Sequence, residues 1–289
     1  MKKKIRIIMK LILFVYLTMG IFVKYCYTQR RIFNGLDAKP KQFPYVVNVR
    51  GIFYTCGGAL ISNRYVLTAG HCLMDIDKDE EVTVILGAHN YYDNRESGRL
   101  LLRSRNHWVH QNFSMPFAEN DLGIIELPYA VNFTDQIRPI KLSTDKGIDA
   151  RMNRDDKEII VILSGWGYQS ADYQPAEILQ TARMKLILYD DCIKFQSHFV
   201  EKLTRNHICA IGRDNQPGHA VLPCDGDSGS PLILDETQEL IGITSYVKDA
   251  ENGSALHYND CRTEIAPAVF VRIPAYLNWI SEKTGMQFE

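Results

Sequence analysis

The eight-residue run CDGDSGSP, from Cys224 to Pro231, places a serine between two glycines within one tight segment. A serine hydroxyl is a weak nucleophile unless a base takes its proton and donors stabilise the oxyanion that forms. Ser228 supplies the hydroxyl. Gly226 allows its own amide and that of Ser228 to converge on one point, because glycine adopts backbone conformations that are closed to other residues. A segment rich in Gly, Asp and Ser is also typical of an ordinary turn, so the run alone leaves both interpretations open.

The residues that could activate this serine lie upstream. A nucleophilic serine needs a histidine as its base and a carboxylate that orients the histidine. The chain carries His71 within TAGHC and Asp121 within NDLGIIEL, so the order is His, Asp, Ser, whereas unrelated folds with this chemistry use other orders. Alone, Asp121 could be a loop aspartate before a buried strand. The other histidines are interpreted as satisfied or solvated side chains: His89, His107, His110, His198, His207, His219 and His257.

Composition and patterning indicate an all-β globular protein. The 289 residues are 46% hydrophobic and 23% charged, which is ordinary for a folded domain, and the formal net charge of −1 gives no support for nucleic-acid binding. Tyr276, Trp279 and Ile280 lie at helical spacing after Pro274 and predict a C-terminal helix that packs on the core. Short strands separated by turns predict a sandwich or barrel, with strands at 82–86, 158–163, 231–234, 240–246 and 268–273.

The N-terminus has the pattern of a secretory signal peptide, so we expect a secreted, extracellular protein without stable membrane association. An apolar stretch at 11–23 is shorter than the roughly 20 apolar residues of a membrane span, and it follows five basic residues, Lys2, Lys3, Lys4, Arg6 and Lys10. A cut after Gly20 satisfies the small-residue rule. A cut after Cys26 and an uncleaved signal anchor are the alternatives.

Taken together, these motifs resemble the trypsin-like (chymotrypsin-family) serine proteases, from about Ile32 to the C-terminus. The resemblance implies two six-stranded antiparallel β-barrels, with the active site in the cleft between them and a connector near 132–156. It implies that His71 is the base, that Asp121 orients it and that Ser228 is the nucleophile.

The same resemblance assigns supporting roles. The amides of Gly226 and Ser228 would form the oxyanion hole, and Ser245 would support Asp121. No cofactor and no metal are implied, because Ala88 stands where the calcium loop of some relatives has a carboxylate. The expected partners are a protein or peptide substrate and, in some settings, a protein protease inhibitor.

Six cysteines lie in the body of the chain, and secretion makes disulfides expected. Their spacing alone permits about 15 pairings. The resemblance selects Cys56–Cys72, Cys192–Cys209 and Cys224–Cys261. Many relatives have a further disulfide, whose two positions here are Val161 and Leu234, so we expect a hydrophobic pair in its place.

The resemblance also implies activation by proteolysis. Arg31 precedes Ile32, where relatives carry a basic residue before Ile-Val-Gly-Gly. Cleavage after Arg31 by an activating protease would free the Ile32 α-amino group, which would then pair with Asp227, because a buried charge is costly unless it is paired. The alternative is a solvated dibasic pair. The expected organisation is a signal peptide at 1–20, or to 26, an activation propeptide at 21–31 and a protease domain at 32–289.

The positions that line the specificity pocket depart from the tryptic pattern. Leu222 occupies the place of the aspartate that holds Arg or Lys, and desolvating an unpaired cation costs several kcal/mol. Val247, after Ser245 and Tyr246, replaces a glycine that opens the pocket, and Ala268 replaces another. We therefore expect an elastase-like preference for small or medium aliphatic P1 residues, with aromatic residues second.

Other features concern the surface and a rival function. Sequons at Asn112, Asn132 and Asn252 predict N-glycosylation. The alternative hypothesis is a weakly active or inactive homologue that acts as a secreted binding or decoy protein. Three departures favour that hypothesis: Ser230 stands where the family has glycine, the specificity pocket is unusual and the 248–260 loop is long.

Overall fold

The chain divides into a segment Met1–Arg30 and a second unit, Arg31–Glu289. The computed structural model describes residues 32, 35–51, 54–77, 79–115, 118–155, 158–168, 174–195, 203–212, 221–247 and 267–288. The predicted leader, its cut sites at Gly20 and Cys26, and Arg31 lie outside these residues. So do Cys261, Asn252 and the 248–260 loop.

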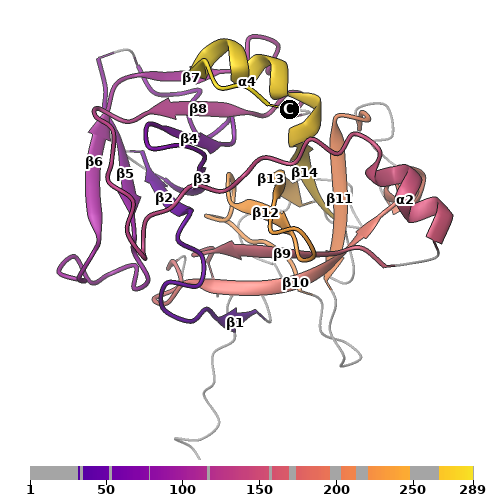
Figure 1. The fold of residues 1–289 in the computed structure, drawn as a ribbon, viewed down its shortest axis with the longest axis horizontal. Coiled ribbons are helices and arrows are strands. Elements are labelled where there is room, and N and C mark those ends of the chain that lie inside the picture. Colours follow the sequence, from indigo (N-terminus) through magenta and orange to yellow (C-terminus); the bar gives the residue numbers. More distant parts are fainter. Residues whose placement is uncertain are drawn as a thin grey trace, which may run out of the picture. The chain divides into compact units, whose positions relative to one another are not determined.

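The first β-sheet contains seven antiparallel strands in the order β6-β5-β2-β3-β4-β8-β7. Its two edge strands are separated by only two residues, because β6 ends at Ser104 and β7 begins at His107, so the sheet has to curl round (Figure 1). The Ser104 hydroxyl donates to the Glu126 carbonyl over 2.5 Å and so ties the edge strand β6 to β8, the neighbour of the other edge strand. The strands are β2 (Val46–Arg50), β3 (Thr55–Leu60), β4 (Tyr65–Thr68), β5 (Val82–Leu86), β6 (Leu100–Ser104), β7 (His107–Val109) and β8 (Gly123–Glu126).

The second sheet closes into a barrel. Its order is β1-β10-β11-β14-β13-β12-β9, and a further pairing of β10 with β9 completes a ring of six strands, with β1 added outside β10. These pairings are antiparallel, which suits strands joined by short connections. The strands are β1 (Leu36–Asp37), β9 (Ile160–Gly165), β10 (Gln180–Ile187), β11 (His207–Gly212), β12 (Pro231–Leu234), β13 (Leu240–Val247) and β14 (Ala268–Arg272).

Helices are few among the described residues. The predicted connector includes α2 (Ile148–Asp155), and α3 (Tyr189–Phe195) precedes β11. After β14 a short 3₁₀-helix, η1 (Ile273–Ala275), leads into α4 (Leu277–Thr284). Gly285 caps the C-terminus of α4 in the left-handed conformation that favours glycine. No helix in these ranges has the length and apolar character that crossing a membrane requires.

The predicted all-β fold with a C-terminal helix is confirmed. The second sheet is a closed six-stranded barrel, whereas the first is a curled sheet of seven strands, one more than predicted. On α4, Trp279 and Ile280 are buried as the helical spacing predicts. Val161 and Leu234 are direct cross-strand partners of β9 and β12, and both are fully buried. They form the expected hydrophobic pair, and burying side chains of this size contributes about 1.5–3 kcal/mol each.

Candidate active site

The predicted base and its carboxylate meet at the end of one strand pair. Strand β4 pairs with β8, with Thr68 opposite Gly123, so the turn after β4 and the residues before β8 lie together. The His71 amide donates to Asp121 Oδ1 over 2.8 Å, and His71 Nδ1 lies 2.8 Å from Asp121 Oδ2. The carboxylate thus holds both the backbone and the ring of His71, which fixes the imidazole's orientation.

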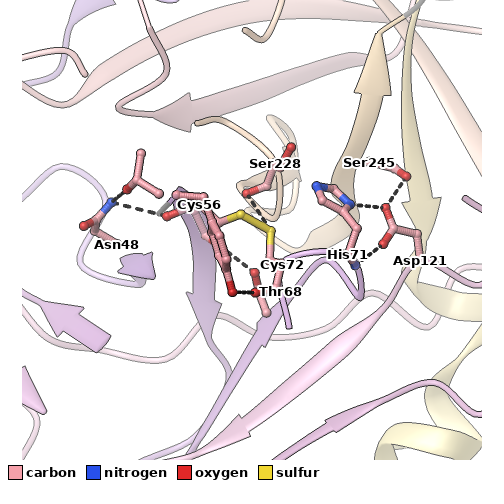
Figure 2. The surroundings of a disulfide bond; sticks show 11 residues. Asn48, Cys56, Thr68, His71, Cys72, Asp121, Ser228 and Ser245 are labelled. Carbon is pink, nitrogen blue, oxygen red and sulfur yellow. Dashed lines mark hydrogen bonds and ion pairs between the residues drawn. A yellow bond between two sulfur atoms is a disulfide. The ribbon is translucent and has the colours of Figure 1, made fainter. Parts of the chain in front are cut away.

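The carboxylate of Asp121 has a third partner in the second sheet. The Ser245 hydroxyl donates to Oδ2 over 2.5 Å, from a bulge in β13 (Figure 2). Asp121 is completely buried, whereas the His71 side chain keeps 28% of its surface exposed. The pair therefore has a buried, hydrogen-bonded anion on one side and an imidazole open to a substrate on the other.

This geometry raises the pKa of His71. Burial by itself lowers the pKa of His71. The charge of Asp121 and its hydrogen bond to the ring together raise the pKa by more than burial lowers it, so the net shift is upward. The imidazolium that forms when the histidine takes a proton is therefore stabilised where it is needed.

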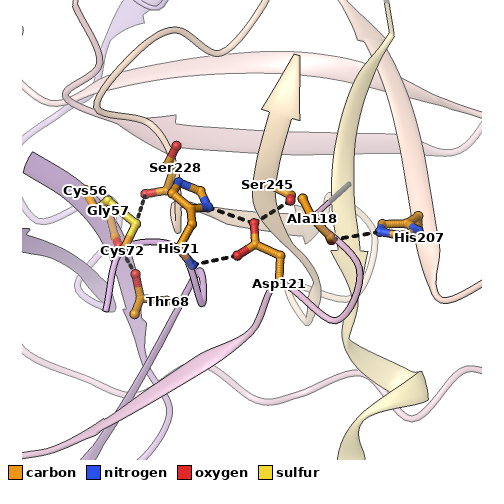
Figure 3. Close-up of polar contacts among 10 residues, drawn as sticks. All are labelled: Cys56, Gly57, Thr68, His71, Cys72, Ala118, Asp121, His207, Ser228 and Ser245. Atoms are coloured by element: carbon orange, nitrogen blue, oxygen red, sulfur yellow. Dashed lines mark hydrogen bonds and ion pairs between the residues drawn. A yellow bond between two sulfur atoms is a disulfide. The ribbon is translucent and has the colours of Figure 1, made fainter. Parts of the chain in front are cut away.

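The predicted nucleophile lies in the turn before β12. Figures 2 and 3 place Ser228 beside the His71 ring, away from Asp121. The Ser228 carbonyl accepts from the Gly57 amide of β3 over 2.7 Å, so the turn is tied to the first sheet. Gly229 has φ of +82°, and a β-carbon there would lie 2.4 Å from the Gly57 carbonyl oxygen, so only glycine fits.

Two amides of this turn have no hydrogen-bond partner among the described residues. The amides of Asp227, Gly229 and Ser230 donate to the carbonyls of Cys224, Thr244 and Asp227, respectively. Those of Gly226 and Ser228 donate to none of the residues that the structure describes. Gly226 has φ of +89°, the left-handed region that lets its amide turn toward that of Ser228. This pattern is the one that an oxyanion hole requires.

Comparison with known proteins agrees with this geometry. The family model described as Trypsin matches residues 32–280, most of the chain. The chain belongs to the trypsin family. It is a serine endopeptidase, and therefore a hydrolase that acts on protein or peptide substrates.

Three relatives illustrate the likeness. The chain is 31% identical over 267 residues to a protein named Collagenase from Hypoderma lineatum, covering 89% of each chain. It is 32% identical over 257 residues to Chymotrypsin from Phaedon cochleariae, covering 86% of this chain and 80% of the relative. It is 30% identical over 285 residues to Kallikrein 1-related peptidase b5 from Mus musculus, covering 94% and 97%, respectively.

Within this trypsin-family domain, the carboxylate of Asp227 is buried and binds backbone amides. Its carboxylate is completely buried and accepts from the Gly167 amide over 2.8 Å and from the Cys224 amide over 3.0 Å. No described Lys, Arg or His side chain forms an ion pair with it. Burial therefore raises the pKa of Asp227 to about 7, in spite of the two hydrogen bonds, and the charge of Asp225 adds to the increase.

The predicted pocket residues come from neighbouring strands. Val247 of β13 pairs with Ala268 of β14, and the Val247 side chain packs against the apolar cluster that contains Ala268. Leu222, Ala268 and Ser245 are buried, whereas Tyr246 is only partly buried. The side chains at 247 and 268 thus occupy space that a pair of glycines would leave open.

Two of the predicted disulfides are present, Cys56–Cys72 and Cys192–Cys209. Cys224 is also disulfide-bonded, and its predicted partner, Cys261, lies outside the described ranges. Cys56, His71 and Cys72 lie close enough together to suggest a metal site, but the disulfide uses both sulfur atoms. It instead anchors the His71 turn to β3.

One supporting residue is invisible to motif reasoning. His207 of β11 is buried; its Nδ1 accepts from the Thr204 amide over 3.1 Å, which places the ring proton on Nε2, 3.4 Å from the Ala118 carbonyl (Figure 3). Ala118 and Asn120 both have positive φ, of 50° and 53°, just before Asp121. The prediction of a satisfied histidine is correct, but only the fold reveals that it contacts the segment that precedes Asp121.

Proposed function

We propose that this trypsin-family endopeptidase cleaves peptide bonds through an acyl-enzyme intermediate, with Ser228 as nucleophile, His71 as general base and Asp121 as the orienting carboxylate. The observation that carries this assignment is the double contact between His71 and Asp121, completed by the Ser245 hydroxyl. A buried carboxylate in that position stabilises the imidazolium without taking its proton.

The steps follow from this arrangement. His71 takes the proton of the Ser228 hydroxyl as the oxygen attacks the substrate carbonyl carbon, and the amides of Gly226 and Ser228 bind the oxyanion. His71 then gives its proton to the departing amine as the C–N bond breaks. A water molecule attacks the ester carbon and gives a proton to His71. The bond between the acyl group and the Ser228 oxygen then breaks, His71 returns the proton to that oxygen, and the carboxylic acid leaves. No step calls for a cofactor.

Labelling with a fluorophosphonate probe tests this assignment. The probe should react with the cleaved protein at Ser228, and Ser228→Ala should abolish labelling and peptidase activity while the protein stays folded. His71→Ala should slow labelling by several orders of magnitude. Equal labelling of the Ser228→Ala variant would contradict the assignment.

We further infer that the chain is made as a zymogen, with a signal peptide at 1–20 or 1–26, an activation propeptide at 21–31 and cleavage after Arg31 by an activating protease. Two observations support this. Asp227 is a buried carboxylate without a described cationic partner, and Ile32 is fully buried in the apolar cluster that includes Leu163 of β9. Strand β9 ends at Gly165, directly against the Asp227 carboxylate.

N-terminal sequencing of the active enzyme should begin at Ile32. An Arg31→Gln variant should remain inactive in the presence of the activating protease, whereas Arg30→Gln, its matched control, should still be activated. Full activity in the Arg31→Gln variant would exclude activation at this bond.

We infer a P1 preference for small or medium aliphatic residues. Leu222 is only 1% exposed and offers no charge for Arg or Lys, while Val247 and Ala268 fill space that glycines would leave open. A panel of chromogenic peptides that differ only at P1 should show best cleavage after Ala or Val, weaker cleavage after aromatic residues and least after Arg. Best cleavage after Arg or Lys would refute the inference.

Secretion and surface modification complete the proposal. Asn112 and Asn132 are exposed, as N-glycosylation requires, and we propose that both carry glycans, as would Asn252. The extracellular enzyme would meet protein inhibitors as well as substrates. The rival hypothesis of an inactive binding protein is not supported, because the relatives described above are named as proteases and the His71–Asp121 contact is intact.

A further inference from the structure

Ser230, which stands where the family has glycine, has a buried hydroxyl that binds none of the described residues. The residue is completely buried, and its Oγ has no hydrogen-bond partner in the part of the chain that the structure describes. Its backbone is fully used, since the Ser230 amide donates to the Asp227 carbonyl and the amide and hydroxyl of Thr244 both donate to the Ser230 carbonyl. The position of Ser230 is therefore fixed. An unpaired buried hydroxyl destabilises the folded state, because the group has lost its hydrogen bonds to water.

The hydroxyl of Ser230 and the carboxylate of Asp227 both lie beside Gly165, where the lack of a side chain leaves space. A β-carbon on Gly165 would lie 2.1 Å from Asp227 Oδ1 and 2.8 Å from Ser230 Oγ. Because both oxygens are that close to one point, they are at most 4.9 Å apart, the sum of the two distances. They do not hydrogen-bond to each other, since Ser230 Oγ has no partner. A β-carbon on Gly57 would lie 2.0 Å from Ser230 Oγ, so the hydroxyl is enclosed on that side as well.

Two oxygens no more than 4.9 Å apart can both accept from one ammonium group. The N–H bonds of an ammonium diverge by about 109°, so two acceptors each about 2.8 Å from the nitrogen lie about 4.6 Å apart. A carboxylate supplies the charge and a hydroxyl supplies a neutral lone pair. We propose that Ser230 is the second acceptor, beside Asp227, for the ammonium group that cleavage creates at Ile32.

Charge and burial agree with this assignment. The charged groups that act on this site are Asp227 and Asp225, both acidic, so the surroundings favour a cation. An ammonium in this space would satisfy the Ser230 hydroxyl and neutralise the Asp227 carboxylate together. Ser230 is thereby a positioning residue: it holds the new N-terminus, which holds Asp227 and the Gly226 amide. The departure from the family's glycine then strengthens the active state and is no sign of a defective enzyme.

This inference rests on the proposed cleavage after Arg31, and the pH dependence of activity tests it. The ammonium must stay protonated for the ion pair to persist, so activity should fall at alkaline pH as this group loses its proton. In Ser230→Ala and Ser230→Gly, the midpoint of the alkaline limb of kcat/KM should be lower by about 0.5–1 pH unit, a three- to tenfold weaker hold on the proton. The acid limb, which reports His71, should not move.

A matched control separates this role from packing. Ser164 is also fully buried with an unpartnered hydroxyl and directly precedes Gly165, so Ser164→Ala should leave the alkaline limb unchanged. Ser230→Ala should lower the melting temperature of the cleaved enzyme but not that of the uncleaved precursor, which merely loses an unpaired hydroxyl. An alkaline limb identical to the wild type, in enzyme sequenced from Ile32, would overturn the role of Ser230 alone. An active enzyme that does not begin at Ile32 would overturn the activation proposal instead.

Discussion

Replacing Asp227 with asparagine should change the stability of the precursor and of the cleaved enzyme in opposite directions. In the uncleaved chain, burial raises the pKa of Asp227 to about 7 from its ordinary value of 3.8. Because the pKa is higher in the folded state, the folded protein binds this proton more tightly than the unfolded chain. The tighter binding of this proton stabilises the folded precursor fully below about pH 4, and this stabilisation is lost as the pH rises to about 7 and beyond.

The size of the effect follows from this pKa. The raised value corresponds to about 4 kcal/mol of stability that the precursor lacks at pH 8 relative to pH 4. Asp227→Asn removes the buried charge but turns an NH₂ group toward the Gly167 or the Cys224 amide, which costs about 1–3 kcal/mol. The variant precursor should therefore be about 1–3 kcal/mol more stable than the wild type at pH 8. After cleavage, the same change leaves the Ile32 ammonium without its counter-charge and should cost about 3–5 kcal/mol.

Urea denaturation with the disulfides intact measures both effects. The precursor is kept whole by Arg31→Gln, the cleaved form is protected from self-digestion by Ser228→Ala, and unfolding is followed by tryptophan fluorescence at pH 5 and pH 8. The reasoning is wrong if Asp227→Asn destabilises both forms equally. It is also wrong if the wild-type precursor loses no more stability between these pH values than the variant does.

Further predictions concern the other residues of the site. Asp121→Asn should lower kcat by about 10⁴-fold, as the same change does elsewhere in the family, and should shift the acid limb of kcat/KM to lower pH, because Asp121 raises the pKa of His71. Gly226→Ala should lower kcat by about 10²–10³-fold with little change in KM, because alanine disfavours φ of +89° and the oxyanion donor is displaced. His207→Leu should lower the free energy of unfolding by about 1–3 kcal/mol in denaturant titrations, and His207→Gln by less, because glutamine keeps a donor near the Ala118 carbonyl. Val247→Gly should shift the P1 profile toward larger side chains in the same peptide panel.

The residues of the proposed triad stand out in the sequence because each lies in a short motif with local structure of its own. The motif around His71 is a strand end followed by a disulfide-anchored turn, and the one around Ser228 is a turn that only glycine permits at 226 and 229. The hydrophobic pair of Val161 and Leu234 was predictable for a related reason. Many relatives have a disulfide between these two positions, and here both cysteines are replaced. A single pairing of two strands therefore explains both replacements.

The contacts around the triad could not be predicted in this way, because they depend on how distant strands align. His207 approaches Ala118 from a strand 89 positions later, and the Tyr276 hydroxyl donates to Asn120 Oδ1 over 3.0 Å from 156 positions later. Nothing in the local sequence of these residues marks them as partners. The left-handed conformation of Ala118 is equally hidden, since alanine rarely adopts it, whereas the asparagine at 120 belongs to the residues that tolerate it.

These distant contacts join the two sheets through the active site itself. The Gly57 amide reaches the Ser228 carbonyl, and the Ser245 hydroxyl reaches the Asp121 carboxylate, each bond crossing from one sheet to the other. The first sheet positions His71 and Asp121 and also binds the Ser228 turn through the Gly57 amide. The second sheet positions Ser228 and binds Asp121 through the Ser245 hydroxyl. The catalytic geometry is therefore a property of the packed pair of sheets. A change that removes one of these bonds, such as loss of the Ser245 hydroxyl, should impair catalysis without unfolding either sheet.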